Sequence, residues 1–231
     1  MATETLVRLK PIDANPKLKD TVYQSLKDAI SDMDIYSGQE PPKLDERKLA
    51  DDLGVSRTPI REAITRLEQE GLVVTYPRRG AFVVRKSKQE ILEIICVWAA
   101  LEGMAARLVT EKASNEEIAS MRKLFATFDD SNEARAHIDE YSETNIEFHQ
   151  RLIELSKCKL LKEIADSLFM HMRAIRRKTI GERDRAAESI IDHMRIIQSL
   201  EDRDATMAEQ LVREHAMYLA NHIKQHVDYL D

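Results

Sequence analysis

The N-terminal third of the chain alternates between helical and extended patterns of apolar residues. Residues Leu18 to Ile35 place Val22, Leu26 and Ile30 on one side of a helix. Pro41-Pro42 then break the chain, because proline cannot continue a regular hydrogen-bonded element. We therefore predict a helix that braces the segment beyond these prolines.

Two short helical patterns meet at Gly54. The first begins after Asp45, whose carboxylate can cap it, and Gly54 ends it because glycine readily adopts positive φ. Its inward face is predicted to consist of Leu49, Ala50 and Leu53. The second begins at Ser56, a predicted hydroxyl cap, with Pro59 in its first turn. Its apolar stripe is Ile60, Ala63, Ile64 and Leu67, which completes the pattern of a helix-turn-helix.

Two β-rich runs, Leu72 to Tyr76 and Ala81 to Arg85, follow the second helical pattern. Pro77-Arg78-Arg79-Gly80 between them has the composition of a hairpin turn. We predict a two-stranded wing with two arginines at its tip. Such a tip suits the narrow, negatively charged minor groove of DNA.

The outward face of the second helix carries a cluster of donors, Arg57, Thr58, Arg61 and Arg66. Such a face can donate hydrogen bonds to phosphates and to guanine edges in the major groove. We predict that Arg57 and Arg61 contact DNA. For Arg66, further along the helix, a solvated surface position is an equally good interpretation.

The run ERKLADDLGVSRTPIREAITRLEQEGLV, followed by PRRGAFV, resembles the DNA-binding domain of GntR-family bacterial transcription regulators. The resemblance implies binding to double-stranded DNA with a palindromic operator. The DNA contacts that it implies are Arg47, Ser56, Arg57, Thr58, Arg61, Arg79 and Gly80. Lys43 replaces a glycine that is usual in the family, and we expect it to change the turn there and not the binding.

From Ser87 onward the chain shows helical patterns without a strand signal. We predict six helices, at about 88–112, 114–129, 132–155, 158–178, 182–203 and 204–230. The predicted fold is mainly α. An N-terminal winged helix-turn-helix (residues 1–86, with an arm over residues 1–16) precedes a C-terminal six-helix bundle (residues 87–231). A bundle of this size can enclose a ligand cavity.

Charge divides the chain in the same way. Residues 1–87 contain 15 Lys+Arg and 14 Asp+Glu, whereas residues 88–231 contain 20 and 27. An acidic bundle repels phosphate, so DNA contact is confined to the first segment. Because that segment has about one net positive charge, we expect useful affinity to require a homodimer.

No apolar run approaches the length of a membrane span, and the first residues lack the apolar stretch of a signal peptide. We expect a cytoplasmic protein without membrane contact. In that compartment Cys96 and Cys158 are predicted to be reduced, buried thiols and not a disulfide or a metal pair.

Four polar residues of the predicted bundle have the chemistry of a metal site. Asn145 and His149 are four residues apart on one helix and share a face, and His193 and His215 belong to the last two helices. Three imidazoles and one amide oxygen can surround a divalent metal. From spacing alone, however, ordinary hydrogen-bonded histidines are the better interpretation.

We call the predicted winged helix-turn-helix, residues 1–86, the reader. The helices after it, with NIEFH, IIDHMRIIQSL and REHAMYLANH, are similar to the FCD ligand-binding domain of the FadR subfamily in its shorter, VanR-like form. Many FCD domains bind a metal through Asp-x-x-x-His and two later histidines. The ligands that this resemblance implies are Asn145, His149, His193 and His215. Asn145 stands where aspartate is usual, so we expect a lower metal affinity. Zinc is the favoured ion, with Ni, Mn and Fe as alternatives. The other histidines, His137, His171, His222 and His226, are not expected to join this site.

The segment IICVWAALEGMAARL resembles the first FCD helix, where an arginine four residues before the position of Glu102 commonly binds an acidic effector. Trp98 replaces that arginine. The effector is therefore either a less acidic molecule or a carboxylate held by another cation. The predicted effector pocket consists of Trp98, Glu102, Arg173 and Arg176. The competing interpretation of the two arginines, with Arg177 and Lys178, is a solvated basic helix face, which the pattern favours.

Together these patterns predict a homodimeric DNA-binding transcription regulator, a repressor, whose DNA affinity a small-molecule effector modulates. A regulator that senses the metal itself is one alternative. A metal-dependent hydrolase is another, with Glu102 as its candidate general base because Glu147 points to a different helix face. We predict that the protein is not an enzyme.

Overall fold

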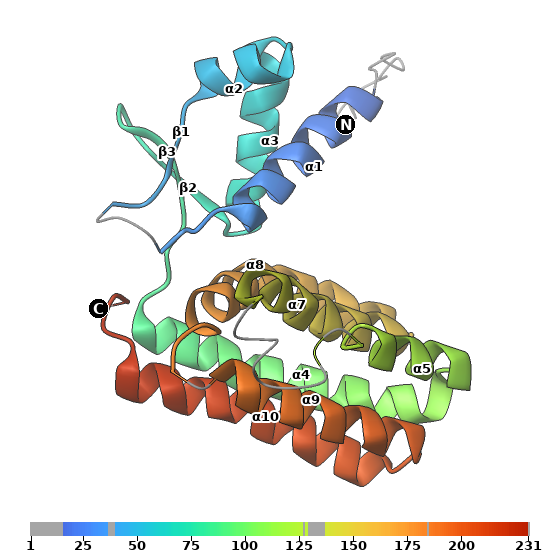
Figure 1. Cartoon of the computed structure of the whole chain (residues 1–231). Coiled ribbons are helices and arrows are strands. Elements are labelled where there is room, and N and C mark those ends of the chain that lie inside the picture. Colours follow the sequence, from blue (N-terminus) through green and yellow to red (C-terminus); the bar gives the residue numbers. More distant parts are fainter. Residues whose placement is uncertain (1–15, 37–39, 127, 129–136, 184, 231) are drawn as a thin grey trace, which may run out of the picture. The chain divides into compact units, whose positions relative to one another are not determined.

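The computed structural model describes residues 16–36, 40–126, 128, 137–183 and 185–230. The chain forms two compact units, shown in Figure 1. The first comprises residues up to Ala29 together with Lys43–Val83, and the second comprises Ile30–Pro42 together with the residues from Val84 onward. The predicted fold class, mainly α with a winged helix-turn-helix and a helical bundle, is confirmed. Among the described helices none is long and apolar enough to span a membrane.

The first unit is a helix-turn-helix with a small sheet. Its elements are α1 (Pro16–Asp32), β1 (Lys43–Leu44), α2 (Glu46–Leu53), α3 (Arg57–Gln69), β2 (Val73–Tyr76) and β3 (Gly80–Val83). The three strands are antiparallel in the order β1-β3-β2. The sequence did not predict β1, because a strand of two residues shows no alternation of its own. It forms only because β3 provides the backbone partners, with Leu44 opposite Ala81.

The two helices of the reader are mostly capped as predicted. Asp45 accepts hydrogen bonds from the backbone N–H groups of Arg47 and Lys48, and Gly54 ends α2 with φ 63°. Ser56 occupies the N-cap position of α3, but its exposed side chain makes no capping hydrogen bond, so that prediction is wrong. Leu53 was also expected inside and is 40% exposed, because short α2 buries only Ala50 fully.

Helix α1 braces the reader through α3. The hydroxyl of Tyr23 donates to Glu70 at 2.6 Å, and the Arg66 guanidinium lies 3.6 Å from the centre of the Tyr23 ring. Arg66 also forms an ion pair with Asp20 at 3.2 Å. Arg66 thus has a structural partner within its own unit, which favours the non-DNA interpretation of this residue.

The second unit is a bundle of long helices. They are α4 (Lys88–Lys112), α5 (Asn115–Lys123), α7 (Ile138–Leu155), α8 (Lys159–Thr179), α9 (Arg185–Glu201) and α10 (Ala205–His226). Helix α5 ends earlier than predicted, at Lys123, and α10 ends at His226. Helix α9 begins later than predicted, at Arg185. The predicted helix start at residue 132 lies outside the described residues. Ser114 and Glu117 form the expected reciprocal cap of α5.

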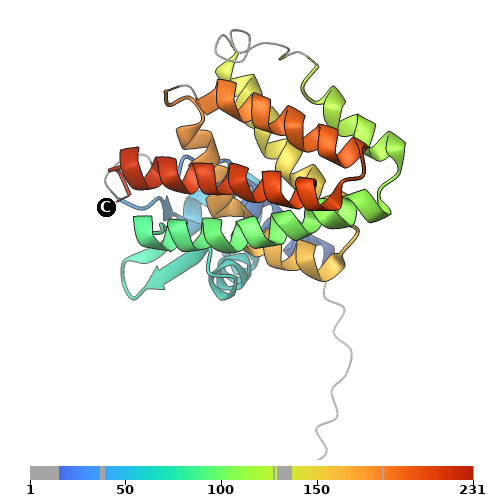
Figure 2. The ribbon, with the colours of Figure 1, turned by 90° about the horizontal axis from the view of Figure 1, so that it is seen from below.

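Helices α4 and α10 run side by side along the bundle, as Figures 1 and 2 show. At Gly103 of α4 the side chain of Arg213 from α10 packs directly over the backbone, since an added Cβ atom would lie 2.9 Å from its Nε. Helix α4 is buried along much of its length, including Trp98 and Glu102. Polar residues of α4 are thereby brought into the interior, where the remaining helices supply their partners.

Candidate nucleic-acid interface and metal centre

Most of the residues predicted to contact DNA lie around one shallow hollow of the first unit, with a volume of about 440 Å³. It lies where α2, the start of α3 and the β-hairpin meet, and five predicted residues line it: Arg47, Arg57, Arg61, Arg79 and Gly80. Ser56 and Thr58 are exposed at the start of α3 without lining this hollow. The arrangement gathers guanidinium groups from three elements on one surface, as phosphate binding requires.

A glutamate that the sequence did not single out holds the two central arginines. Oε2 of Glu46 accepts hydrogen bonds from Nη2 of Arg57 at 2.9 Å and from Nε of Arg61 at 2.7 Å. These two hydrogen bonds, Arg61 first, lower the pKa of Glu46 below its ordinary value. The partners are 11 and 15 residues away in the chain, across the turn, so no local spacing marked Glu46.

The hairpin tip presents Arg79 on an aromatic support. Its guanidinium lies 5.5 Å from the ring centre of Tyr76 and 5.8 Å from that of Phe82. Gly80 has φ 100°, and a Cβ there would lie 3.2 Å from Cε of Lys43. Lys43 itself belongs to β1, opposite Phe82, and lines the same hollow. The expectation that Lys43 alters a turn is therefore wrong.

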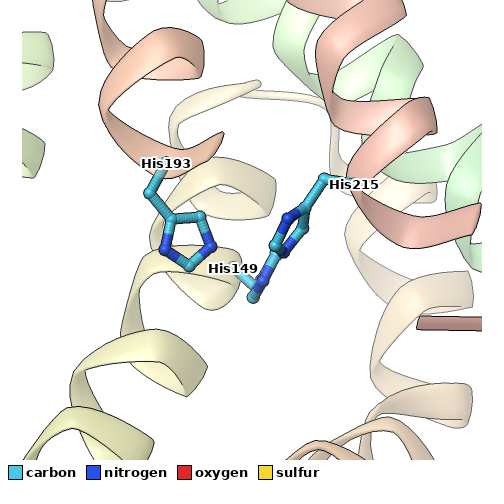
Figure 3. Close-up of side chains that lie close together, drawn as sticks. All are labelled: His149, His193 and His215. Atoms are coloured by element: carbon cyan, nitrogen blue, oxygen red, sulfur yellow. The ribbon is translucent and has the colours of Figure 1, made fainter. Parts of the chain in front are cut away.

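The second unit brings three predicted metal ligands together in its interior. His149 comes from α7, His193 from α9 and His215 from α10, and Figure 3 shows their rings pointing toward one another. Each offers a ring nitrogen, and these nitrogens all lie within 4.8 Å of one another. All three residues are buried. A metal bonded to two imidazoles at about 2.1 Å each requires nitrogens roughly 3–4 Å apart, so small side-chain movements suffice.

Hydrogen bonds from neighbouring residues orient all three rings. Nδ1 of His149 bonds to Oε1 of Glu102, Nδ1 of His215 lies 3.1 Å from Oδ2 of Asp192, and Nδ1 of His193 lies 3.4 Å from the hydroxyl of Tyr141. Each ring thus uses Nδ1 for the protein, and the Nε2 atoms of His149 and His193 have no hydrogen-bond partner among the described residues. Carboxylate partners of this kind fix metal-binding imidazoles and raise their basicity.

Several buried polar atoms of this centre have no hydrogen-bond partner among the described residues. They include Nε2 of His149, Nε2 of His193 and Oδ1 of Asn145. Asn145 lies one turn before His149 on the same face of α7, so its amide is on the side of the histidines. Because unsatisfied buried polar atoms are costly, a divalent cation fits this donor set.

Burial also keeps these imidazoles in the form that binds metals. It lowers the pKa of His193 well below the ordinary 6.5. It lowers the pKa of His215 too, although the hydrogen bond to Asp192 opposes the shift. Metal ions bind neutral imidazole, so neither ring needs to lose a proton at pH 7 before coordination.

Three of the four residues of the predicted effector pocket come together beside the metal centre. Nη2 of Arg176 lies 3.5 Å from Oε2 of Glu102, and its guanidinium lies 5.7 Å from the centre of the Trp98 ring. Arg176 is only 4% exposed, and its Nη1 has no hydrogen-bond partner among the described residues. The interpretation of Arg176 as part of a solvated face is therefore wrong. Burial raises the pKa of Glu102, while the charge of Arg176 opposes this effect.

The flanking residues of α8 behave differently. Arg173 lies at the edge of the bundle and pairs with Glu143 at 3.1 Å. Arg177 is exposed and pairs with the same glutamate, as a solvated face predicts. Glu147 is exposed, as expected from its helix face.

Among the cysteines, Cys96 is exposed and Cys158 half-buried, so the prediction that both thiols are buried is wrong, although both are free.

The remaining described histidines stay apart from the metal centre. His222 bonds to Glu182 at 2.6 Å, and its ring lies 5.3 Å from that of His226. His171 is buried in α8, and His137 is exposed. None of them joins the three-histidine cluster, as the spacing predicted.

Comparison with known proteins gives both units a family. Residues 18–83 match the model of bacterial regulatory proteins of the gntR family, and residues 93–217 match the FCD domain. The Nta operon transcriptional regulator of Aminobacter aminovorans is 31% identical over 84% of this chain and 87% of its own length. The HTH-type transcriptional repressor RspR of Escherichia coli is 23% identical, over 79% of each chain.

A solved structure agrees with this fold. Escherichia coli McbR/YncC has a TM-score of 0.74 at 23% identity, covering 91% of this chain and 99% of its own. The two matched domains stand in the chain in the order that the reader and the bundle take in the structure. The protein belongs to the GntR family of bacterial DNA-binding transcription regulators and carries a C-terminal FCD domain.

Proposed function

We propose that this regulator is a homodimeric repressor whose affinity for a palindromic operator is set by a small-molecule effector bound beside a divalent metal. The observation that carries the proposal is the buried group of His149, His193 and His215, with unused Nε2 atoms next to the Glu102–Arg176 pair. The name of the relative RspR, a transcriptional repressor, supports the direction of regulation.

The metal would be held by the three histidines, with the side-chain oxygen of Asn145 as the fourth candidate donor. The amide oxygen of Asn145 carries no charge, so we infer that the site binds a divalent metal less tightly than it would with a carboxylate at this position. When bound, the metal would supply a Lewis-acidic point for oxygen atoms of the effector. Zinc suits three imidazoles and an oxygen, and Ni, Mn or Fe are the alternatives.

Arg176 is the cation that we assign to an acidic effector. Among the described residues, Nη1 of its buried guanidinium has no hydrogen-bond partner, and Glu102, with which it forms an ion pair, also bonds to His149. A carboxylate that binds Arg176 would draw it away from Glu102, and the hydrogen bond that orients His149 would change with it. In this way the effector and the metal centre share one network.

The DNA contacts are proposed on the surface where the predicted residues gather. Arg57 and Arg61 at the start of α3 would enter the major groove, and Arg79 at the hairpin tip would reach the minor groove. Two copies of the reader, one per half-site, match a palindromic operator. The effector would then shift the population between dimers that fit the operator and dimers that do not.

A regulator that senses the metal alone is the second candidate. It is favoured by the unsatisfied Nε2 atoms of His149 and His193, which a metal alone would satisfy. A hydrolase is not supported, because Glu102 is already bonded to His149 and Arg176, and the relatives described above are regulators.

The test combines elemental analysis and native mass spectrometry of the purified protein with operator-binding measurements. We expect one divalent metal per chain and a copurifying organic acid whose addition weakens operator binding. Arg176→Met should keep the metal and lose the response to the acid, whereas Arg151→Met, at a half-buried position of α7 outside the histidine cluster, should keep both. If chelation alone changes operator affinity and no small molecule does, the metal-sensing alternative is correct. Protein without metal that still responds to the acid would overturn the proposed centre.

A further inference from the structure

A second hollow, with a volume of about 450 Å³, lies between the first turn of α9 and the last turns of α10. Arg185 and Glu188 line it from α9, and Tyr218, His222 and His226 line it from α10. Figure 2 shows these two helix ends side by side. No histidine of the metal centre lines it, and Arg185 precedes His193 by eight residues, about 12 Å along the helix. The hollow is therefore separate from the metal centre.

The wall of this hollow contains a buried cation, Arg185, that forms no ion pair with any described residue. Arg185 is 6% exposed, so its side chain is more than nine-tenths buried. Its Nη1 donates to Oγ1 of Thr179, and its Nε has no hydrogen-bond partner among the described residues. Burial lowers the pKa of Arg185 to about 10, with a further contribution from Arg176, so the group stays charged at neutral pH.

The two described carboxylates nearest in the chain to Arg185, Glu182 and Glu188, are engaged with other residues. Glu182 accepts hydrogen bonds from His222 at 2.6 Å and from Tyr229 at 3.3 Å. Glu188 accepts the hydroxyl hydrogen of Tyr218. No described carboxylate forms an ion pair with Arg185, although removing an unpaired charge from water is costly. A buried guanidinium that forms no ion pair with the described residues, in a side chain that lines a hollow, is the arrangement that an oxyanion completes.

We propose that this hollow is a second ligand site, which binds a small oxyanion, the carboxylate or phosphate group of a metabolite, through Arg185. Exposed amide side chains of α10, Asn221 and Gln225, also line the hollow and supply further donors to the anion. The site needs no metal, and Arg176 of the proposed effector site is not among the residues that line it. An occupant would connect α9 with α10 directly and with α8 through the bond from Arg185 to Thr179.

The probes are inorganic phosphate and succinate, added separately to the full-length protein at constant ionic strength adjusted with sodium chloride. Binding is measured by calorimetry and by the shift of the thermal unfolding midpoint. We expect saturable binding of at least one probe, the same affinity after the metal is removed with a chelator, and at least tenfold weaker binding in Arg185→Met. Arg185→Lys should lie between the two, because it keeps the charge and loses the planar donors. The matched control Arg151→Met should bind as wild type does.

A second variant guards against loss of folding in Arg185→Met. Asn221 is exposed, so Asn221→Trp should fill the hollow without disturbing the core, and it should unfold at the wild-type temperature while losing the anion. Preference for phosphate or for succinate identifies which source of the anion the hollow accepts. The proposal is overturned if neither probe saturates, or if a folded Asn221→Trp protein binds as wild type does. It is equally overturned if chelation abolishes binding while Arg185→Met retains it, because the anion then lies at the metal centre.

Discussion

Two arginines of the reader, Arg57 and Arg61, form ion pairs with Glu46 that contacts with DNA could replace. Arg57 and Arg61 are more than half exposed, and both donate to one partly exposed carboxylate of Glu46. Ion pairs at such exposed positions stabilise a fold only slightly, because water and salt screen them. A phosphate or a guanine edge can therefore take over the same donors at little cost.

Arg61→Ala should weaken operator binding by about 1–3 kcal/mol, the range for losing a two-pronged contact with a base. Fluorescence anisotropy with a labelled operator measures the effect. Arg66→Ala is the matched control. It removes the contacts with Tyr23 and Asp20, so it should lower the unfolding temperature and leave the operator affinity of the folded protein unchanged. Wild-type operator affinity in Arg61→Ala would rule out the proposed base contact.

Glu46→Gln should change specificity more than affinity. Removing a negative charge from the hollow that we propose faces DNA favours phosphate binding to any sequence, while the two arginines lose the shared charged acceptor that holds them. We expect tighter binding to non-specific DNA and a several-fold smaller ratio of operator to non-specific affinity. Titrations with both DNAs at two salt concentrations measure this ratio, and an unchanged ratio would contradict a positioning role for Glu46.

His193→Ala should remove bound metal and lower the thermal unfolding temperature of the metal-loaded protein, because one of three imidazole donors is lost. His226→Ala, which changes an exposed histidine outside the cluster, is the control and should keep the metal. Elemental analysis of dialysed protein provides the measurement. A wild-type metal content in His193→Ala would exclude this residue as a ligand.

At the scale of elements, apolar periodicity was sufficient to predict the helices and the hairpin, but it could not predict what depends on distant partners. Strand β1 exists only because β3 lies beside it. The start of α9 lies three residues later than predicted, since Gly181-Glu182 marks a turn without showing its length. Long-range folding also supplies the residues that support the candidate metal centre. Glu102 is 47 residues from His149, and Asp192 bonds to the ring of His215 and not to neighbouring His193.

Helix α8 carries a pH-sensitive element in His171, whose burial lowers its pKa from 6.5 to about 4. In the unfolded chain His171 takes up a proton near pH 6.5, but in the folded protein it does so only near pH 4. Its contribution to the free energy of unfolding is therefore present above pH 6.5 and is lost as the pH falls toward 4. Between pH 7.5 and 5 the loss should be about 2 kcal/mol. Urea unfolding of metal-free wild type and His171→Phe at both pH values isolates this share. Equal pH dependence in the two proteins would assign it to other groups.

At the scale of the whole molecule, the charge balance predicts that a single reader binds DNA weakly. Residues 1–87 hold 15 basic and 14 acidic side chains, and the remaining chain is acidic. We therefore expect a homodimer by sedimentation analysis, and a footprint with two half-sites separated by a whole number of DNA turns. Operator affinity should fall steeply with salt. One chain bound per operator at full affinity would contradict the dimer.

The buried carboxylate of Glu102 would couple the binding of the proposed metal to the binding of the proposed effector. One oxygen of Glu102 bonds to His149, a candidate metal ligand, and the other pairs with Arg176, the arginine that we assign to the effector. By thermodynamic reciprocity, if the effector changes the affinity of the protein for the metal by some factor, the metal changes the affinity for the effector by the same factor. If both proposed ligands bind, the response of transcription to the organic acid would depend on the supply of the metal, and the response to the metal on the supply of the acid.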